Sequence, residues 1–566
     1  MPDKGGLELV LCWHMHQPQY RRSADGVYQQ PWVYLHAIKD YADMAAHLEA
    51  VPAARAVVNF APILLDQIAD YVTQVETHLR HGTPLRDPVL AGLSEVYPAS
   101  AADRAALVAS YLRANPTRMI DRFPVLRRLS ALAAPLREDP RLGGYVSDTY
   151  LRDLAVWYHL AWVGETVRRD DARVAALAAQ AQGFEASALR GLLALIGEVL
   201  AGLVPRYKRL ADEGRVELSF TPYAHPIIPL MLDFAVAREA QPDIILPRAH
   251  HYPGGLERAR WQIHAGQAAF RRHFDREPAG CWPAEGGLSA ALLALLDEAG
   301  VSWTASGERV LRHSFAAQSR VGDEASVHRA FAVPSSRLRC FFRDDGLSDL
   351  IGFSYAHWHA DDAVANLLSH LENIARLSAA EEPPLVAIIM DGENAWEYYP
   401  ENGYYFLRTL YERLADHPVI RLTTFSDYLA RHAVPAELPP LVAGSWVNGT
   451  FATWIGSPDK NRGWDMLVQA KIDYDRVMAT GRLTPEERAR AAEALAVCEG
   501  SDWCWWFGDY NPRASVMDFE ALYRRHLHDL YDILGVTPPA FIDEAFTEQQ
   551  REEIGRGGAM RAADAV

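Results

Sequence analysis

The chain has 566 residues, of which 49% are hydrophobic and 23% are charged, so it is neither a disordered nor a fibrous protein. A single hydrophobic core stops growing near ~250–300 residues, and a chain of this length should therefore divide or carry large insertions. The 73 acidic residues against 56 Lys and Arg give a net charge of -17. This charge argues against nucleic acid and anionic membranes as partners, because both attract cationic surfaces.

The cysteines and the apolar segments indicate a soluble cytoplasmic protein. The five cysteines include no CxxC pair, which fits neither a disulfide framework nor a structural zinc site. The apolar run near the N-terminus is too short for a signal peptide. The longest apolar stretch, Leu192 to Val204, is shorter than the ~20 residues of a membrane helix.

Short runs rich in β-forming residues alternate with long helical stretches. The runs are Leu7–Trp13, Ala56–Phe60, Arg215–Phe220, Gly280–Trp282, Val301–Thr304, Arg339–Phe342, Leu385–Met390 and Val419–Thr424. Most are apolar almost throughout, which is typical of parallel strands covered on both faces. The alternation predicts an α/β fold, and the number of runs favours a barrel over an open sheet.

Two regions lack strand formers and are predicted to be helical. Between Pro62 and Gly214, Ala, Leu and Arg dominate, which indicates a helical insertion. After the Pro-rich boundary AVPAELPPLV the chain is again mostly helical, with a helix start at Thr484 marked by Pro and Glu at the expected positions. The last residues, 556–566, are expected to be a frayed end. The predicted organisation is a catalytic domain at 1–430 with an insertion at about 62–214, and a mainly helical C-terminal domain at 431–566.

Histidines and carboxylates follow four of the predicted strands, where parallel barrels carry their functional side chains. His14 and His16 follow the first strand and His225 the third. His14 and His16 are two residues apart, so on a strand they point to the same face. Such a pair could be a hydrogen-bonded structural pair, metal ligands or groups that bind a polar substrate, and the motif alone leaves these alternatives open.

Two of the strands lead into carboxylates that could act together. Glu285 lies between Trp282-Pro-Ala and two glycines, where a ligand can approach closely because glycine adds no bulk. Asp391 directly follows an apolar strand. Each alone could be a helix cap or a surface residue. Together they supply the nucleophile and the proton donor that glycoside hydrolysis needs, and their different flanks could separate their pKa values.

Tryptophans beside these motifs favour a sugar substrate, because apolar sugar faces stack on aromatic rings. Trp282, Trp396, Trp446 and Trp454 lie near polar motif residues. For most of the cluster at 503–506, core packing is the better interpretation. Trp446 and Asp502 stand in polar loops, which favours a place for both in the site.

Taken together, these segments resemble glycoside hydrolase family 57, which includes α-amylases, amylopullulanases, 4-α-glucanotransferases and branching enzymes. Five short motif regions carry the resemblance. They are His14-Met15-His16-Gln17-Pro18, the segment from Gly214-Arg215-Val216-Glu217-Leu218 to His225 and Pro229, Trp282-Pro283-Ala284-Glu285, Asp391-Gly392-Glu393, and the weaker Thr423-Thr424-Phe425-Ser426-Asp427-Tyr428-Leu429.

The resemblance implies an incomplete (β/α) seven-stranded barrel with a helical insertion and a C-terminal helical domain that closes over the cleft. It assigns Glu285 as nucleophile and Asp391 as acid/base. The implied substrate-binding residues are His14, His16, His225, Trp282, Arg343, Glu393, Trp396, Trp446 and Asp502, of which Arg343, Trp446 and Asp502 are the looser matches. No cofactor and no metal are implied.

The expected function is that of a retaining, α-amylase-like hydrolase of α-1,4-linked glucans, with an α-glucan or malto-oligosaccharide as substrate. The sequence Asn394-Ala395-Trp396 replaces the Phe-Gly common in the family's transferases and favours hydrolysis. A 4-α-glucanotransferase or branching enzyme is the alternative within the family. Outside it, the alternatives are a zinc α-mannosidase or amidohydrolase, with His14, His16, His225 and Asp391 as ligands, and a non-catalytic glucan-binding protein. Chain-length preference, α-1,4 against α-1,6 specificity and oligomeric state stay open.

Overall fold

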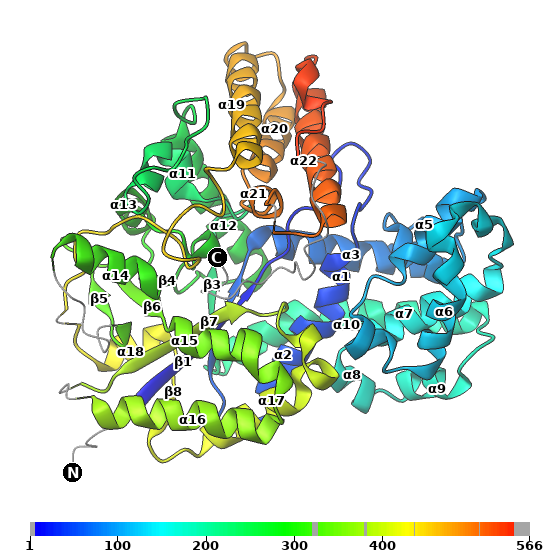
Figure 1. Ribbon diagram of the computed structural model, residues 1–566, viewed down its shortest axis with the longest axis horizontal. Coiled ribbons are helices and arrows are strands. Elements are labelled where there is room, and N and C mark those ends of the chain that lie inside the picture. The colour runs from blue at the N-terminus through cyan, green and yellow to red at the C-terminus, as the bar shows by residue number, and fades with distance from the viewer. Residues whose placement is uncertain (1–5, 320–326, 379–381, 435, 509, 548–566) are drawn as a thin grey trace.

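The computed structural model describes residues 6–319, 327–378, 382–434, 436–508 and 510–547. At its centre lies a mainly parallel sheet (Figure 1). The strands are β1 (Leu7–Met15), β2 (Ala56–Phe60), β3 (Val216–Phe220), β4 (Trp303–Gly307), β5 (Phe331–Ala332), β6 (Arg339–Arg343), β7 (Leu385–Asp391) and β8 (Ile420–Leu422). They pair in the order β3-β2-β1-β7, with β8 also on β1, and in the order β4-β6-β5. Every ladder is parallel except the one between β5 and β6.

Single contacts join the two strand groups. Cys281 forms isolated parallel bridges to Phe220 at the end of β3 and to Thr304 in β4. Next to β6, the backbone N–H of Asp344 donates to the carbonyl of Ala387 in β7 at 2.8 Å. These observations confirm the predicted α/β fold with a parallel sheet. No ladder joins β6 to β7 among the described residues, so the seven-stranded barrel stays a prediction.

Both faces of the sheet are buried, as the apolar strands predicted. In β1, Leu9 and Leu11 belong to the large core beneath the helices, whereas Val10 and Cys12 belong to a second core cluster. This second cluster also contains Trp282, Trp303, Phe341, Ile389 and Phe425. The alternation follows from the two-residue period of a strand.

Seven of the eight predicted runs contain a strand, and the exceptions have local causes. The prediction at Gly280–Trp282 was wrong, since only Cys281 pairs and Pro283, which lacks an N–H, ends the extended run. The strand expected at Val301–Thr304 begins at Trp303 and continues to Gly307. The sequence analysis missed β5, whose two residues are too few for a periodic pattern.

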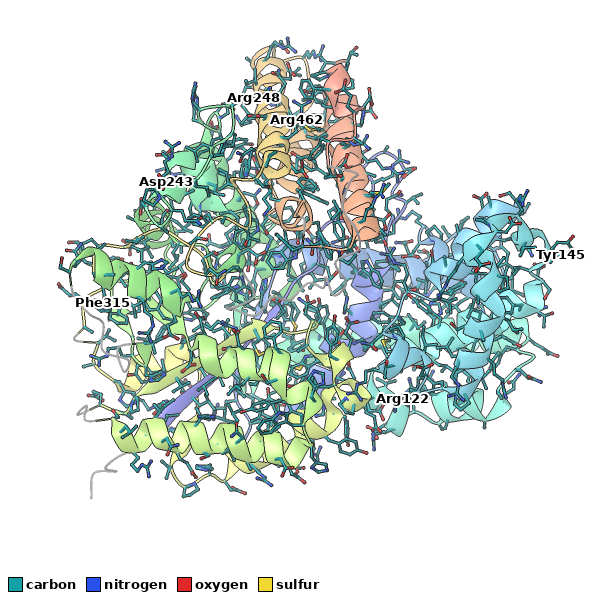
Figure 2. All side chains as sticks on the ribbon, viewed as in Figure 1. Arg122, Tyr145, Asp243, Arg248, Phe315 and Arg462 are labelled. Atoms are coloured by element: carbon teal, nitrogen blue, oxygen red, sulfur yellow. The ribbon has the colours of Figure 1, made fainter. Side chains whose placement is uncertain are left out.

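The chain between β2 and β3 is helical, as predicted, and extends to one side of the sheet (Figure 1). Its helices are α3 (Pro62–His81), α4 (Pro88–Ala91), α5 (Ala101–Ser110), α6 (Pro124–Glu138), α7 (Asp148–Trp162), α8 (Glu165–Asp170), α9 (Ala172–Gln180) and α10 (Ala186–Asp212), with short 3-10 and π turns between them. Tyr145 lies at the outer end of this segment (Figure 2).

Helix α10 contains the apolar stretch Leu192 to Val204 and extends beyond it at both ends. By length and composition alone α10 could cross a membrane, and no other helix in the described part of the chain meets this criterion. Its buried residues recur with the period of a helix, at Leu189, Leu192, Leu193, Leu195, Ile196, Leu200, Leu203, Tyr207 and Leu210. One face is therefore packed in the core and the other is open, the pattern of an amphipathic helix of a globular protein.

The remaining helices cover the sheet or form the C-terminal part. Around the sheet lie α1 (Trp32–His36), α2 (Ala42–Ala50), α11 (Ile228–Leu232), α12 (Gly255–Phe274), α13 (Ala290–Glu298), α14 (Glu308–Ala317), α15 (Asp345–Asp349), α16 (Ala360–Leu377), α17 (Tyr404–Ala415) and α18 (Phe425–Arg431). The C-terminal helices are α19 (Pro458–Ala479), α20 (Pro485–Cys498), α21 (Asp502–Trp506) and α22 (Arg513–Leu534), and they stand together at the top of Figure 1.

The helix start predicted at Thr484 is confirmed. Thr484 and Glu487 form a reciprocal capping box at the beginning of α20, with Pro485 in the first turn. This box satisfies two backbone donors that the helix itself leaves unpaired. The frayed end expected at 556–566 lies outside the described residues.

Candidate active site

One row of the sheet carries polar side chains at the carboxyl ends of four strands. His14 of β1 stands opposite Asn59 of β2 on one side and Asp391 of β7 on the other. Asn59 in turn stands opposite Ser219 of β3. Parallel strands end on the same edge of a sheet, so segments far apart in the sequence meet here.

A cavity of about 590 Å³ opens over this edge. It contains eight of the eleven residues that the sequence analysis selected: His14, His16, His225, Glu285, Asp391, Glu393, Trp446 and Asp502. Helical segments complete the lining with, among others, Trp32, Arg113, Asn115, Trp162, Trp505 and Phe519. A volume of this size is in the range of small-molecule binding sites.

Glu285 projects into the cavity from a tight turn. The turn is a single 3-10 turn, Ala284–Gly286, in which Glu285 itself has a left-handed backbone with φ 57°. Such a conformation is uncommon for a residue with a side chain and is found at functional sites. A Cβ at Gly286 would lie 2.8 Å from the ring of Trp282. The space beside this glycine is thus filled by Trp282, and the close approach of a ligand to Glu285 stays a prediction.

Both carboxylate oxygens of Glu285 have hydrogen-bond donors. Trp446 Nε1–H donates to Oε2 at 3.0 Å, and the hydroxyl of Ser501 lies 3.2 Å from Oε1. Burial raises the pKa of Glu285 to about 8, and the charges of Asp391 and Asp502 add to this rise. The two hydrogen bonds act in the opposite direction, because they stabilise the ionised form.

Asp391 is held by one neighbour. Asn394 Nδ2–H donates to Asp391 Oδ2 at 2.7 Å. Burial raises the pKa of Asp391 to about 6, whereas Asn394 and the nearby His16 and Arg343 lower it. Two buried carboxyl groups therefore face one cavity, and their proton affinities lie close to neutral pH, where acid–base catalysis operates.

The loop after Asp391 is fixed against β1. Trp396 Nε1–H donates to the carbonyl of Gly392 at 2.9 Å. A Cβ at Gly392 would lie 2.2 Å from the sulfur of Met15, so glycine is needed for this close approach. Glu393 accepts from Gln17 Nε2 at 3.3 Å, and burial raises its pKa well above the usual range.

Three histidines form a stack on the cavity wall. The ring of His16 lies flat on that of His225, with centroids 3.8 Å apart, and His14 Nε2 lies 3.0 Å from His225 Nε2. His16 Nε2 lies 2.9 Å from a carboxylate oxygen of Asp502. Burial lowers the pKa of His14 to about 3 and that of His225 well below its usual value, so both rings are neutral.

The same cluster offers atoms that could bind a metal. His16, His225 and Asp502 place one possible ligand atom each within 4.8 Å of one another. Both ring nitrogens of His225 already have hydrogen-bond partners, His14 at 3.0 Å and Ser501 at 2.8 Å. A metal would have to replace one of these partners, since each nitrogen has a single position for a proton or a ligand.

Three residues predicted to bind substrate do not line the cavity. Trp282 is buried and packs edge-on against Trp446, and Trp396 is buried against Trp13. The buried Arg343 pairs with Asp345 and Asp349 at 2.7 Å each. These residues support the site from behind, and a direct substrate contact for any of them stays an untested prediction.

The sequence analysis missed several residues of the site. Ser501 and Asn394 contact the two carboxylates, but a lone Ser or Asn carries no pattern that marks it. Trp505 and Trp506 line the cavity, although core packing was the preferred interpretation of their cluster. Arg113 and Asn115 come from the helical segment before β3, and only the tertiary fold brings them to the site.

Comparison with known proteins agrees with this geometry. The family model described as glycosyl hydrolase family 57 matches residues 10–439. A family 57 branching enzyme from Thermococcus kodakaraensis is 16% identical with a TM-score of 0.56, over 93% of this chain and 89% of that one. A branching enzyme of the same type from Pyrococcus horikoshii is 15% identical with a TM-score of 0.58, over 93% and 89%. An α-amylase from Thermotoga maritima is 13% identical with a TM-score of 0.57, over 94% and 93%. At these identities the structural similarity concerns the fold.

Proposed function

Because the chain belongs to glycosyl hydrolase family 57, we propose that it is a retaining enzyme acting on α-1,4-linked glucans, with Glu285 as nucleophile and Asp391 as acid/base. The observation that carries this proposal is the pair of buried carboxyl groups facing one cavity, with hydrogen-bond donors on both oxygens of Glu285 and on one oxygen of Asp391. Two donors favour an ionised nucleophile. In the free protein burial leaves the pKa of Glu285 at about 8, above that of Asp391 at about 6, so the proton that the pair shares must pass from Glu285 to Asp391 before the first step.

The proposed reaction is a double displacement. Glu285 attacks the anomeric carbon while Asp391 gives its proton to the leaving glycosidic oxygen, and a covalent glycosyl-enzyme results. Asp391 then takes a proton from water, which attacks the same carbon and releases Glu285. Retention requires the two carboxyl groups to act from about 5–5.5 Å apart. His14, His16, His225, Glu393 and Asp502 supply hydrogen-bonding groups for sugar hydroxyls, and Trp446 an aromatic surface.

Transfer to a sugar hydroxyl is the alternative outcome of the second step. The similar structures include branching enzymes as well as an α-amylase. The same glycosyl-enzyme serves both outcomes, so a 4-α-glucanotransferase or branching enzyme uses the same two carboxyl groups. We favour hydrolysis on the sequence that follows Asp391, Asn394-Ala395-Trp396.

The proposal includes an organisation of the chain. Residues 1–430 form the catalytic part with the helical insertion at about 62–214. Residues 431–566 form a C-terminal part that contributes Trp446 and Asp502 to the cavity lining and the Ser501 hydroxyl to Glu285. We propose that the strands close into the incomplete seven-stranded barrel of the family, which the single bridges at Cys281 and the alternating cores of β1 support. A cytoplasmic location agrees with five free, buried cysteines.

The test compares products from maltoheptaose and amylose, resolved by size and linkage. Shorter linear products indicate hydrolysis, longer linear products indicate 4-α-glucan transfer, and new α-1,6 linkages indicate branching. Glu285→Gln and Asp391→Asn should each lose activity by several orders of magnitude. Wild-type protein that leaves all α-glucans unchanged, or variants that retain full activity, would contradict the proposal.

A further inference from the structure

A buried chain of hydrogen bonds runs from the sheet to Glu285. The Asn59 amide lies 2.7 Å from His14 Nδ1, and His14 Nε2 lies 3.0 Å from His225 Nε2. His225 Nδ1 lies 2.8 Å from Ser501 Oγ, which lies 3.2 Å from Glu285 Oε1. Asn59, His14, His225 and Ser501 are all buried. In such a chain each member must donate on one side and accept on the other, so the whole chain has a direction.

Thr221 determines this direction at the far end. Its hydroxyl oxygen lies 2.7 Å from the carbonyl of Trp282 and 2.9 Å from the amide atom of Asn59 that also faces His14. A carbonyl only accepts, so the single hydroxyl proton goes to Trp282. The structure places Asn59 Oδ1 toward both Thr221 and His14, and Asn59 Nδ2 donates to Ser219 Oγ at 3.0 Å. With the hydroxyl proton on Trp282, two oxygens without a proton between them would face each other 2.9 Å apart, so we exchange the amide oxygen and nitrogen of Asn59. The NH2 group then donates to Thr221 and His14, and Ser219 donates to the amide oxygen. The two ends of an amide are distinguished by this kind of accounting.

The orientation of the Asn59 amide then determines which ring nitrogen of His14 and of His225 carries the proton. His14 Nδ1 accepts from Asn59, so neutral His14 carries its proton on Nε2 and donates it to His225 Nε2. Neutral His225 therefore carries its proton on Nδ1 and donates it to Ser501 Oγ. The hydroxyl proton of Ser501 is left with one acceptor in the chain, Glu285 Oε1.

We propose that Thr221, Asn59, His14 and His225 orient Ser501 as a fixed hydrogen-bond donor to Glu285 and thereby favour the ionised nucleophile. Thr221 and Asn59 do not line the cavity, so they are positioning residues. The inference deepens the proposed function: burial leaves the pKa of Glu285 at about 8, above that of Asp391 at about 6, and a fixed donor stabilises the negative charge that Glu285 must carry when it attacks. Asp391 and Asp502 oppose that charge, and Trp446 Nε1–H supports it on the second oxygen.

Neutron diffraction from the deuterium-exchanged protein at neutral pH tests the direction directly. We expect deuterium on His14 Nε2, on His225 Nδ1 and on Thr221 Oγ1 toward Trp282. Deuterium on His14 Nδ1 with a bare Nε2 would overturn the proposal. This measurement is independent of the substrate, so it does not depend on the proposed function.

Thr221→Val tests the consequence without touching the cavity, because valine keeps the size and lacks the hydroxyl. We expect kcat/KM to fall about 10- to 100-fold, the effect of losing one hydrogen bond to a charged group. The limb near pH 8, which follows the pKa of Glu285, should move to higher pH. Ser501→Ala should produce the same shift, whereas Thr221→Ser, which keeps the hydroxyl, should retain the wild-type limb. If the limb near pH 8 stays at the wild-type pH in both Thr221→Val and Ser501→Ala, the proposal is wrong, whatever their stability.

A second cavity, of about 280 Å³, lies beside the loop that follows β7. Its lining is rich in aromatic rings and includes Tyr355, Trp358, Tyr399, Tyr405 and Phe406, with His359 and Asp361 at its polar part. Trp358 and Tyr405 are about half exposed, at 46% and 49%. Large exposed rings together on a protein surface mark a binding site.

The loop connects this second cavity with the active site. Tyr398 lines the active-site cavity and its neighbour Tyr399 lines the second one. Two consecutive residues of this loop therefore line the two cavities. Aromatic faces with a few polar groups suit the apolar faces and hydroxyls of a neutral sugar chain.

We infer that the second cavity binds the same α-glucan chain outside the active site; this inference rests on the proposed function. The test is retention on amylose in affinity electrophoresis, with activity on a short aryl maltoside as the measure of the active site. Trp358→Ala with Tyr405→Ala should weaken retention about tenfold and leave the short substrate unaffected. Tyr145→Ala, an exposed ring at the far end of the helical segment, is the matched control (Figure 2).

Unchanged retention in the double variant would overturn this inference while the proposed function stands. A wild-type protein that is inactive on the aryl maltoside and is not retained by amylose contradicts the proposed function and this inference together. If light scattering shows a wild-type dimer that the double variant cannot form, the rings are a self-association surface and the inference is wrong.

Discussion

Trp446 is joined to Glu285 by two hydrogen bonds, one from its indole Nε1–H to Oε2 and one from its backbone N–H to the Glu285 carbonyl, each 3.0 Å long. The C-terminal part of the chain thus fixes both the turn and the carboxylate of the proposed nucleophile. A Cβ at Gly307 would lie 2.6 Å from the Cα of Trp446, so the end of β4 must be glycine for this loop to pack there.

Trp446→Phe keeps an aromatic ring and removes the indole donor. We expect kcat to fall about 10- to 100-fold, because a hydrogen bond to a charged group contributes about 1.5–3 kcal/mol. Steady-state kinetics on maltoheptaose measures the effect. Trp464→Phe is the control, since Trp464 donates to the carbonyl of Trp454 at 2.9 Å outside the cavity lining. A Trp446→Phe variant as active as this control would contradict the prediction.

The pH dependence of kcat/KM should be bell-shaped, with limbs near pH 6 and pH 8. Burial raises the pKa values of Asp391 and Glu285 to about 6 and about 8, and catalysis requires one proton shared by the pair. Below the lower limb both groups are protonated, so the nucleophile is lost. Above the upper limb both are ionised, so the acid is lost.

The Asp391→Asn variant shows which carboxyl group is responsible for each limb of the pH profile. With an activated aryl glycoside, which needs little acid assistance, the variant should lose the basic limb. Its acidic limb should then follow Glu285 alone and lie between the two wild-type limbs, since the loss of the Asp391 charge lowers the pKa of Glu285 from about 8. A basic limb that persists in this variant would show that another group is the acid.

The sequence was informative where a residue and its neighbours both carry a signal. His14 and Asp391 lie at the carboxyl ends of the apolar strands β1 and β7, and Glu285 follows the single paired residue Cys281. Because parallel strands end at one edge, the meeting of these three residues could be predicted. Ser501 and Asn59 could not, since their roles depend on hydrogen bonds between distant segments. For Trp282 and Trp396, which are buried behind the cavity, the sequence offers no means of choosing, because a Trp within a motif has the same sequence signature whether it contacts substrate or packs behind the site.

A buried ion pair holds the C-terminal part against the sheet domain. Arg258 of α12 donates to both carboxylate oxygens of Glu499, at 2.7 and 3.0 Å, and Tyr252 and Gln262 also donate to this carboxylate. Glu499→Ala leaves Arg258 buried without its partner, so we expect a loss of about 3–5 kcal/mol in the free energy of unfolding. Activity should fall as well, because Ser501 follows two residues later.

The same helix provides the control for this ion pair. Arg260 and Glu298 form a similar pair at 2.9 Å, but both side chains are about half exposed. Glu298→Ala should change the stability little, since exposed pairs contribute little. Thermal unfolding and kcat of the two variants test the prediction, which fails if Glu499→Ala is as stable and active as Glu298→Ala.

Chelation tests the metal alternative. We expect activity to survive prolonged EDTA treatment and the purified protein to contain no stoichiometric zinc, because both ring nitrogens of His225 are engaged by His14 and Ser501 and His16 Nε2 lies against Asp502. Elemental analysis and activity before and after treatment measure this. Added zinc should not raise the Tm, since a ligand that binds the native state stabilises it by mass action. Activity that disappears with EDTA and returns with stoichiometric zinc would make His16, His225 and Asp502 metal ligands and would replace the two-carboxylate mechanism.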